Sequence, residues 1–262
     1  MPDIAPIIEL RRVSKSFGKQ RVLADVDLRV EPGKTTVIMG RSGTGKSVLL
    51  KHIVGLLKPD IGEVYFQGER IDQLSESRLI PIRQQISLVF QLNALFDSMS
   101  VGENVAFPMR ENSRKRLSSA ALRSMVERCL GEVGLTGFEN KRPAELSGGE
   151  KKRVALARAI AMDPPPKVIL YDEPTAGLDP QRSDVINKLI RRLQHDFNVT
   201  GVVVTHDLKS AGEIGDRLLL LHQGRFLADG TPDDLMRHSD PQVRRFVEGV
   251  ADPADLFWMN RA

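Results

Sequence analysis

Cysteine is nearly missing from this chain of 262 residues, in which Cys129 is the only one. A lone cysteine excludes a disulfide within the chain and is typical of proteins in a reducing cytosol. The fold must therefore rest on apolar packing, and 41% hydrophobic residues are enough for a sizeable core. The length suits one large domain or two small ones.

Long apolar runs are missing as well. No stretch comes near the roughly 18 residues that a membrane-spanning helix requires. The first residues, from Met1 to Pro6, lack the basic stretch and apolar core of a secretory signal. We therefore expect a soluble, cytoplasmic protein that reaches a membrane only through a partner.

Internal repeats, low-complexity tracts and a strong charge of one sign are also absent. The formal net charge is only +4, and the basic residues are spread along the chain. Such a distribution does not indicate a nucleic-acid partner.

One stretch carries a strong chemical signal. It fits the pattern G-x-x-x-x-G-K-[ST] of a phosphate-binding loop and consists of Gly40, Arg41, Ser42, Gly43, Thr44, Gly45, Lys46 and Ser47. Glycines let backbone N–H groups close around a polyphosphate, and the next helix adds partial positive charge at its N-terminus. We expect Lys46 to reach the β- and γ-phosphates and the Ser47 hydroxyl to hold Mg²⁺.

The flanking sequence agrees with a nucleotide-binding α/β fold. Residues 35–39 are predicted to form a buried strand, and residues 48–54 a helix. Apolar runs at 86–90, 167–171 and 201–205 indicate further buried strands. Strands that alternate with helices are typical of a parallel sheet covered on both faces.

Other segments complete this outline. Alternating apolar and polar residues at 25–30 and 63–67 predict a small antiparallel sheet beside the nucleotide. The pattern from 92 to 164 is helical, with a polar loop expected at 112–119. Another amphipathic helix, with Ser183 as its expected cap, is indicated by the spacing of Val185, Ile186, Leu189, Ile190 and Leu193.

Two acids, Asp172 and Glu173, follow the apolar strand at 168–171. Ligands of open α/β sheets bind at the carboxyl ends of the strands. Asp172 is therefore placed to bind Mg²⁺, and Glu173 to orient an attacking water as a base. The alternative is a pair of solvated loop acids.

A second candidate anion site begins another helix at residues 146–150. Ser147 and Glu150 have the spacing of a capping box, and Gly148 and Gly149 leave amide groups uncovered. A plain helix start is the alternative. Because one triphosphate does not need two such sites from one chain, the pair predicts a dimer with shared nucleotides.

Three more polar residues stand near strand ends or turns. Gln91 and His206 each follow a predicted strand, where Gln91 could sense metal and water and His206 could contact the γ-phosphate. His206 could equally be a satisfied structural histidine. Asp179 lies in Gly177-Leu178-Asp179-Pro180 and could be only a turn aspartate.

The order of these motifs resembles that of the ATP-binding subunits of ABC transporters, over nearly the whole chain. The family's motifs fall on the Walker A loop at 40–47, the Q-loop Gln91, the signature at 146–150, the Walker B strand at 168–172, the catalytic Glu173, the D-loop at 177–180 and the switch His206. Its adenine-stacking aromatic falls on Phe17. The resemblance implies that the chain binds MgATP and hydrolyses ATP as a homodimer, with each nucleotide held between Walker A of one chain and the signature of the other.

The resemblance also implies a P-loop NTPase fold in a single ABC ATPase domain. The nucleotide-binding core would comprise 1–91, which includes an antiparallel β subdomain, and 165–235. A helical signature subdomain would occupy 92–164, and a C-terminal helix and tail 236–262.

Two positions depart from the family's pattern. Glu150 ends the signature where glutamine is usual, which brings negative charge near a phosphate site. Val48 follows the Walker A loop where threonine is frequent, which loses one hydroxyl contact with the nucleotide. Neither departure removes a catalytic group.

Residues 90–101, 103–111 and 240–252 are similar to segments of the MlaF-like ATPases, which transport phospholipid for MCE proteins. This resemblance implies an ATPase on the cytoplasmic face of the inner membrane. Its partners would be a permease, an MCE-type lipid-binding protein and, in some systems, a small STAS-domain protein. The alternatives are an ABC ATPase for another solute, or a soluble one such as an iron–sulfur assembly component.

Two apolar groups remain to be explained. Leu92, Leu95, Phe96 and Met99 are predicted to cluster beside the Q-loop, where a permease helix would fill the cluster or the helical subdomain would bury it. An amphipathic helix is predicted over 241–250, with Asp240 as cap, Pro241 in the first turn, and Asp252-Pro253 as its end. Residues 253–262 are expected to pack on their own domain, on the other ATPase subunit or on an accessory protein.

Overall fold

The computed structural model describes residues 5–112 and 118–250. Most of the polar loop predicted at 112–119, and the whole tail predicted at 253–262, lie outside the described residues. The described chain forms two sheets, a four-stranded one in the order β2-β1-β4-β5 and a six-stranded one in the order β10-β9-β3-β8-β7-β6.

The smaller sheet is antiparallel and comes from the N-terminal part of the chain. Its strands are β1 (Ile8–Phe17), β2 (Gln20–Val30), β4 (Ile61–Phe66) and β5 (Glu69–Arg70). Val26, Leu28 and Val30 of β2 are buried, whereas the residues between them are exposed. The alternation at 25–30 therefore predicted this sheet correctly.

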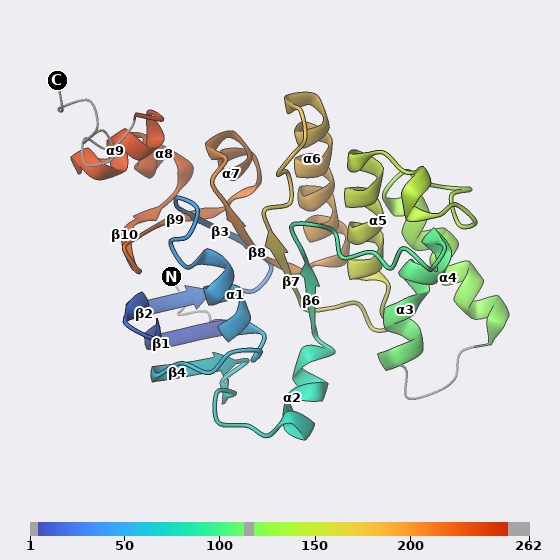
Figure 1. Cartoon of the computed structure of the whole chain (residues 1–262), viewed down its shortest axis with the longest axis horizontal. Helices are drawn as coiled ribbons and strands as arrows, with labels where there is room; N and C mark the ends of the chain where they lie inside the picture. Colours follow the sequence, from blue (N-terminus) through green and yellow to red (C-terminus); the bar gives the residue numbers. More distant parts are fainter. Residues whose placement is uncertain (1–4, 113–117, 251–262) are drawn as a thin grey trace.

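The larger sheet lies at the centre of the molecule (Figure 1). Five of its strands are parallel, and the sixth, β10, runs antiparallel to β9 at the edge. The six strands are β3 (Thr35–Met39), β6 (Ile86–Val89), β7 (Val168–Asp172), β8 (Thr200–Thr205), β9 (Arg217–His222) and β10 (Arg225–Gly230). The predicted α/β class with a parallel core sheet is confirmed.

Alternate residues of the central strands supply two different cores. In β7, Leu170 packs in the core that faces α1 and the antiparallel sheet, while Ile169 and Tyr171 pack in the core on the helical side. A strand buried on both faces needs apolar residues at every position. This requirement explains the unbroken apolar runs in the sequence.

The helices are arranged around this sheet as Figure 1 shows, with α3, α4 and α5 together at one end and α8 and α9 near the other. Their bounds are α1 (Lys46–Ile53), α2 (Glu76–Arg83), α3 (Val101–Asn112), α4 (Ser119–Glu132), α5 (Gly148–Ile160), α6 (Pro180–Phe197), α7 (Leu208–Ile214), α8 (Pro232–Met236) and α9 (Pro241–Val247). Among the described residues, no helix combines the length and apolar character needed to cross a bilayer.

The cap of α6 differs from the prediction. Asp179, not Ser183, stands at the N-cap, and its carboxylate accepts bonds from the backbone N–H groups of Gln181 and Arg182. The next residue, Pro180, suits the first helical position because it has no N–H group to satisfy. The N-cap thus lies four residues before the predicted one.

The end of α9 also differs from the prediction. Asp240 caps the helix as expected, but the helix ends at Val247 and does not continue to residue 250. Gly249 has a φ of 68°, and the N–H groups of Gly249 and Val250 bond back to Phe246 and Arg245. This is a Schellman motif, which glycine permits at low cost.

Within the part of the chain that the structure describes, a buried histidine in α1 lacks a partner for one of its ring nitrogens. His52 is 1% exposed, its Nδ1 lies 2.7 Å from the Val48 carbonyl oxygen, and its Nε2 has no partner among the described residues. Burial lowers the pKa of His52, and the charge of Lys15 acts in the same direction. Near pH 6.5 the His52 imidazole therefore becomes protonated in the unfolded chain and remains neutral in the folded chain.

We predict that acidification weakens the fold through His52. Because the folded pKa is depressed, stability is full above the unfolded pKa and falls as the pH drops below it. The free energy of unfolding, measured by urea denaturation at about pH 7.5 and about pH 5.5, should fall less in His52→Leu than in the wild type. The control is His195→Asn, because the side chain of His195 is 90% exposed. This variant should show the wild-type pH dependence of the free energy of unfolding. The same pH dependence in His52→Leu would contradict the explanation.

Candidate active site

The loop from Gly40 to Gly45 joins β3 to α1, as the sequence predicts. At Gly45 the backbone has a φ of 103°, and a Cβ there would lie 2.9 Å from the Val22 side chain and 3.1 Å from the Val22 carbonyl oxygen. Only glycine combines that conformation with so close an approach to β2. The loop is therefore pinned between the two sheets.

Lys46 folds back over this loop. Its side chain is 6% exposed, and Nζ donates hydrogen bonds to the carbonyl oxygens of Gly40 and Arg41 at 2.7 and 3.0 Å. Oε1 of Glu173 lies 3.6 Å from Nζ. Burial lowers the pKa of Lys46, and the nearby carboxylate opposes that effect. The ammonium thus stands inside the loop with an acid on its other side.

Ser47 and Asp172 bring two oxygen ligands together. The Ser47 hydroxyl donates to Oδ1 of Asp172 at 3.0 Å, and burial raises the pKa of the Asp172 carboxyl. Hydroxyl and carboxylate oxygens fit Mg²⁺, which binds through few protein ligands and completes its shell with water and phosphate oxygens. Within the described residues, no group of three or more His, Cys, Asp or Glu side chains is arranged to hold a metal ion.

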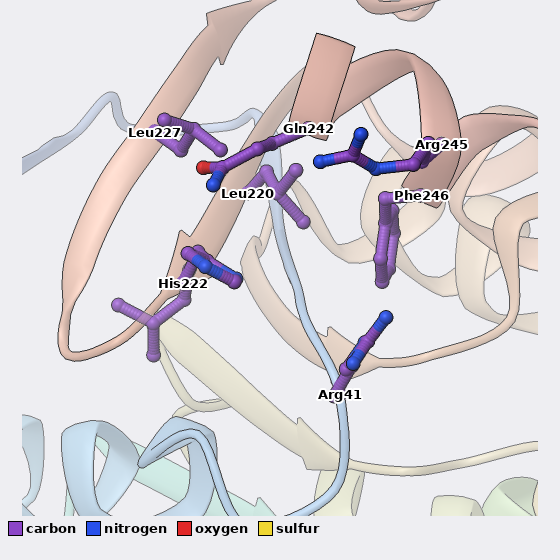
Figure 2. A pocket seen from close by; sticks show the side chains of 8 residues that line it. Arg41, Leu220, His222, Leu227, Gln242, Arg245 and Phe246 are labelled. Carbon is purple, nitrogen blue, oxygen red and sulfur yellow. The ribbon is translucent and has the colours of Figure 1, made fainter. Parts of the chain in front are cut away.

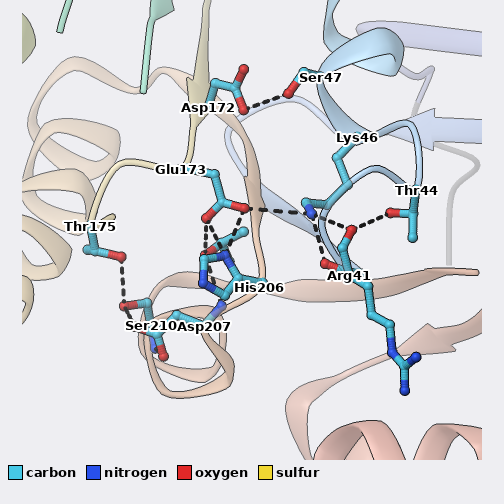
Figure 3. Close-up of polar contacts among 12 residues, drawn as sticks. Arg41, Thr44, Lys46, Ser47, Asp172, Glu173, Thr175, His206, Asp207 and Ser210 are labelled. Carbon is cyan, nitrogen blue, oxygen red and sulfur yellow. Dashed lines mark hydrogen bonds and ion pairs between the residues drawn. The ribbon is translucent and has the colours of Figure 1, made fainter. Parts of the chain in front are cut away.

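Glu173 faces the end of the neighbouring strand. Both of its carboxylate oxygens lie 3.0 Å from Nδ1 of His206 (Figure 3). Oε2 also accepts a hydrogen bond from the Thr205 hydroxyl at 3.1 Å. The Glu173 backbone has a φ of 49°, which is unusual for a residue with a side chain and is found at functional sites. The ends of β7 and β8 therefore converge on one carboxylate.

Most of the predicted site residues line one cavity of about 640 Å³, within the size range of small-molecule sites. The predicted residues on its wall are Phe17, Arg41, Ser42, Gly43, Gly45, Lys46, Ser47, Val48, Gln91, Glu173 and His206. Aromatic, basic and acidic groups thus share one space large enough for a nucleotide.

Three residues that the sequence did not predict also line the cavity, namely Gln20 and Val22 of β2 and Phe246 of α9. Phe246 and Arg41 also line a smaller neighbouring cavity beside β9. Figure 2 shows the Phe246 ring extending from α9 toward the loop that carries Arg41. The sequence predicted an amphipathic helix over 241–250, but no sequence signal indicated which element that helix would cover.

The signature residues and Asp179 do not line the nucleotide cavity. The predicted capping box at the start of α5 is confirmed, because Ser147 Oγ accepts from the Glu150 N–H and the Glu150 carboxylate accepts from the Ser147 N–H. A Cβ on Gly148 would come within 3.8 Å of the Leu178 side chain. The signature therefore lies beside the 177–180 turn of its own chain and away from its own Walker A loop.

The Glu150 carboxylate takes part in this capping box. Its hydrogen bonds with Ser147 lower the pKa of the Glu150 carboxyl, so the group stays ionised at neutral pH. The carboxylate that departs from the family's usual glutamine thus serves the helix start in this chain.

Two basic residues of α5 hold the segment that follows β6, and neither was predicted. Nζ of Lys152 donates to the carbonyl oxygens of Gln91 and Glu173, and the Arg158 guanidinium donates to those of Asn93 and Ala94. In the sequence, Lys152 lies within a run of basic residues that looks like a solvated helix face.

The predicted apolar cluster beside Gln91 is divided in two. Leu95 packs against the helical-side core, whereas Leu92 is 87% exposed. Phe96 is 40% exposed, and its ring lies 4.8 Å from that of Phe107 between centroids. Only part of the cluster is thus available to a partner.

Comparison with known proteins agrees with this geometry. A family model described as "ABC transporter" matches residues 23–176. The chain is 42% identical over 250 residues to the "Intermembrane phospholipid transport system ATP-binding protein MlaF" of Escherichia coli K12, covering 95% of this chain and 91% of that protein. It is 42% identical to "Protein TRIGALACTOSYLDIACYLGLYCEROL 3, chloroplastic" of Arabidopsis thaliana, covering 95% and 76%.

A third relative is named for the transport of a different solute. The "Probable ribonucleotide transport ATP-binding protein mkl" of Mycobacterium tuberculosis is 40% identical over 242 residues, covering 92% of this chain and 66% of that protein.

The chain is also similar to solved structures of ABC transporter cassettes. The dimeric post-hydrolysis state of the ATP-binding cassette MJ0796, bound to ADP and Pi, is 35% identical, with a TM-score of 0.78 over 86% of this chain and 98% of that one. The cbiO1 subunit from Clostridium perfringens, part of the transporter complex cbiONQ, is 30% identical, with a TM-score of 0.81 over 97% and 99%.

Proposed function

The chain belongs to the ABC transporter family and is an ABC ATPase, and from this premise we propose that it drives phospholipid transport between membranes. The observation that carries this proposal is the 42% identity, over 95% of the chain, to a protein named for intermembrane phospholipid transport. Transport of another solute is the second candidate, because mkl is named for ribonucleotide transport at nearly the same identity.

We propose that two copies of the chain share two nucleotides. ABC cassettes form dimers, as MJ0796 does in its solved structures. The signature at 146–150 stands apart from its own chain's nucleotide cavity. A partner subunit would supply its signature to that cavity, and Asp179 would lie near the interface between the two subunits.

The arrangement of each site suggests how ATP is held. The adenine would stack on Phe17, and the phosphates would lie in the loop at 40–47 with Lys46 as their cationic partner. Ser47 and Asp172, with Gln91 nearby, would hold Mg²⁺. The ion would neutralise phosphate charge and orient the γ-phosphoryl group.

Glu173 is the proposed general base. Its carboxylate is fixed by Thr205 and lies against His206, so it can accept a proton from water at the γ-phosphate. His206 would then steady the charges of Glu173 and of the terminal phosphate. The Lys46–Glu173 contact would be replaced when the phosphates enter.

The proposed partners are an integral membrane permease, an MCE-type lipid-binding protein and, in some systems, a small STAS-domain protein. A coupling helix of the permease would cover Leu92 and Phe96, which lie exposed beside Gln91. Large exposed apolar side chains at such a position favour a protein partner. The chain would therefore work as a peripheral subunit on the cytoplasmic face of the membrane.

We predict that Glu173→Gln retains ATP binding and loses hydrolysis. The amide keeps the size and planar shape of the carboxylate and one acceptor oxygen but cannot accept the proton, which costs about 10²–10⁴-fold in rate. ATP affinity measured by equilibrium titration should stay close to the wild-type value, and the variant should accumulate as an ATP-bound dimer. A wild-type rate would remove Glu173 from the role of base.

We predict that Leu92→Asp separates the chain from its permease. Wild-type protein with an affinity tag, purified from detergent-solubilised membranes, should bring an integral membrane protein and phospholipid identifiable by mass spectrometry. Leu92→Asp should lose both, because a charge cannot enter an apolar interface without a partner. The control Met236→Asp changes an exposed apolar residue of α8, at the other end of the molecule, and should retain them. A membrane partner that carries a different solute and no phospholipid would favour the second candidate.

A further inference from the structure

Lys152 connects two parts of the nucleotide site from a position behind it. It belongs to α5, and only 4% of it is exposed. Its Nζ donates to the main-chain oxygen of Gln91 at 2.6 Å and to that of Glu173 at 3.4 Å. Gln91 and Glu173 come from the ends of β6 and β7, and both line the nucleotide cavity. One ammonium thus joins the two strand ends on which the proposed chemistry depends.

The contact made by Lys152 acts on the main chain and not on the reactive side chains. A buried ammonium carries a desolvation penalty that packing alone does not offset. Its acceptors here are neutral main-chain oxygens, so the contact fixes backbone position and leaves both reactive side chains free to face the cavity. A charged donor makes such bonds stronger than those of neutral groups.

A second anchor strengthens the same connection. The Arg158 guanidinium donates to the carbonyl oxygens of Asn93 and Ala94 at 2.7 and 2.6 Å. Together with Lys152, it fastens the chain from 91 to 94 to α5 at three carbonyl groups. This segment therefore follows α5 when the helix moves.

The start of α5 is the signature. Lys152 lies five residues after Ser147, which is about 7.5 Å along the helix axis at 1.5 Å per residue. A helix is stiff over so short a distance, so a displacement at Ser147 reaches Lys152 almost undiminished. A signature that meets a nucleotide of the partner subunit would in this way act on its own chain's Gln91 and Glu173.

We propose that Lys152 is a positioning residue for ATP hydrolysis, which ties the main chain of Gln91 and Glu173 to the signature helix and so links the two nucleotide sites of the dimer. The inference rests on the roles proposed above for Gln91, Glu173 and a signature shared between subunits. It assigns Lys152 no contact with ATP.

The test compares two substitutions of Lys152 in the full-length dimer. Lys152→Met keeps most of the length of the side chain and removes the donor, and it should lower kcat by about 10–100-fold through misplacement of the catalytic groups. ATP affinity should stay within about threefold of the wild-type value, since the Walker A loop is untouched. The Hill coefficient for ATP should fall toward 1. Lys152→Gln retains two N–H donors and should recover most of the lost rate.

Arg153→Met is the matched control. Arg153 lies on the same helix but donates to the carbonyl oxygens of Val133 and Gly134, away from the nucleotide cavity. Its loss should lower the melting temperature and leave kcat and the Hill coefficient unchanged.

The outcomes separate the inference from the proposed function. A kcat within twofold of wild type in Lys152→Met would overturn the inference, as would an equal loss of kcat in Arg153→Met or a failure of Lys152→Gln to recover activity. Glu173→Gln, assayed alongside, tests the base itself. Normal hydrolysis by that variant would overturn the role of Glu173 independently of Lys152.

Discussion

The parallel register of β3, β7 and β8 is the constraint on which the rest of this structure depends. It brings three strand ends to one edge of the sheet, where Asp172 meets Ser47 and Glu173 meets His206. None of these pairs is close in sequence, so only strand pairing places them together. The two cores that hold β7 on both faces therefore also hold the site.

The helical end of the molecule adds a second level of organisation. The signature begins α5, and α5 holds the chain after β6 and the end of β7 through Lys152 and Arg158. The signature does not line the nucleotide cavity of its own chain, yet its helix is bonded to the main chain of that site through Lys152. These two features together favour a dimer whose two sites respond to each other. The exposed Leu92 lies within the fastened segment 91–94, where the proposed permease could move this segment or be moved by it.

The sequence was most informative where a residue's role follows from local chemistry. Buried strands require apolar residues at every position, and the acids and glycines that follow them have few structural uses, so the strands and the residues around the nucleotide cavity could be predicted. Features that depend on competition between local signals, or on how helices pack, could not be predicted. Asp179, which the sequence analysis placed only in a turn, forms the cap that was expected of Ser183, and the α9 stop at Gly249 competed with a longer apolar pattern. Phe246 and Lys152 gained their positions from helix packing, which leaves no local signal.

The central claim is that each nucleotide is held between two chains, and subunit complementation tests it most directly. Lys46→Ala removes the Walker A cation, and Ser147→Arg blocks the signature, so each variant alone should form inactive dimers. A mixed dimer of the two places both defects in one shared site and leaves the other site intact. The account therefore predicts that ATP hydrolysis returns when the two inactive variants are unfolded and refolded together. If the mixture stays inactive although mass spectrometry shows mixed dimers, both motifs act within one chain and the account is wrong.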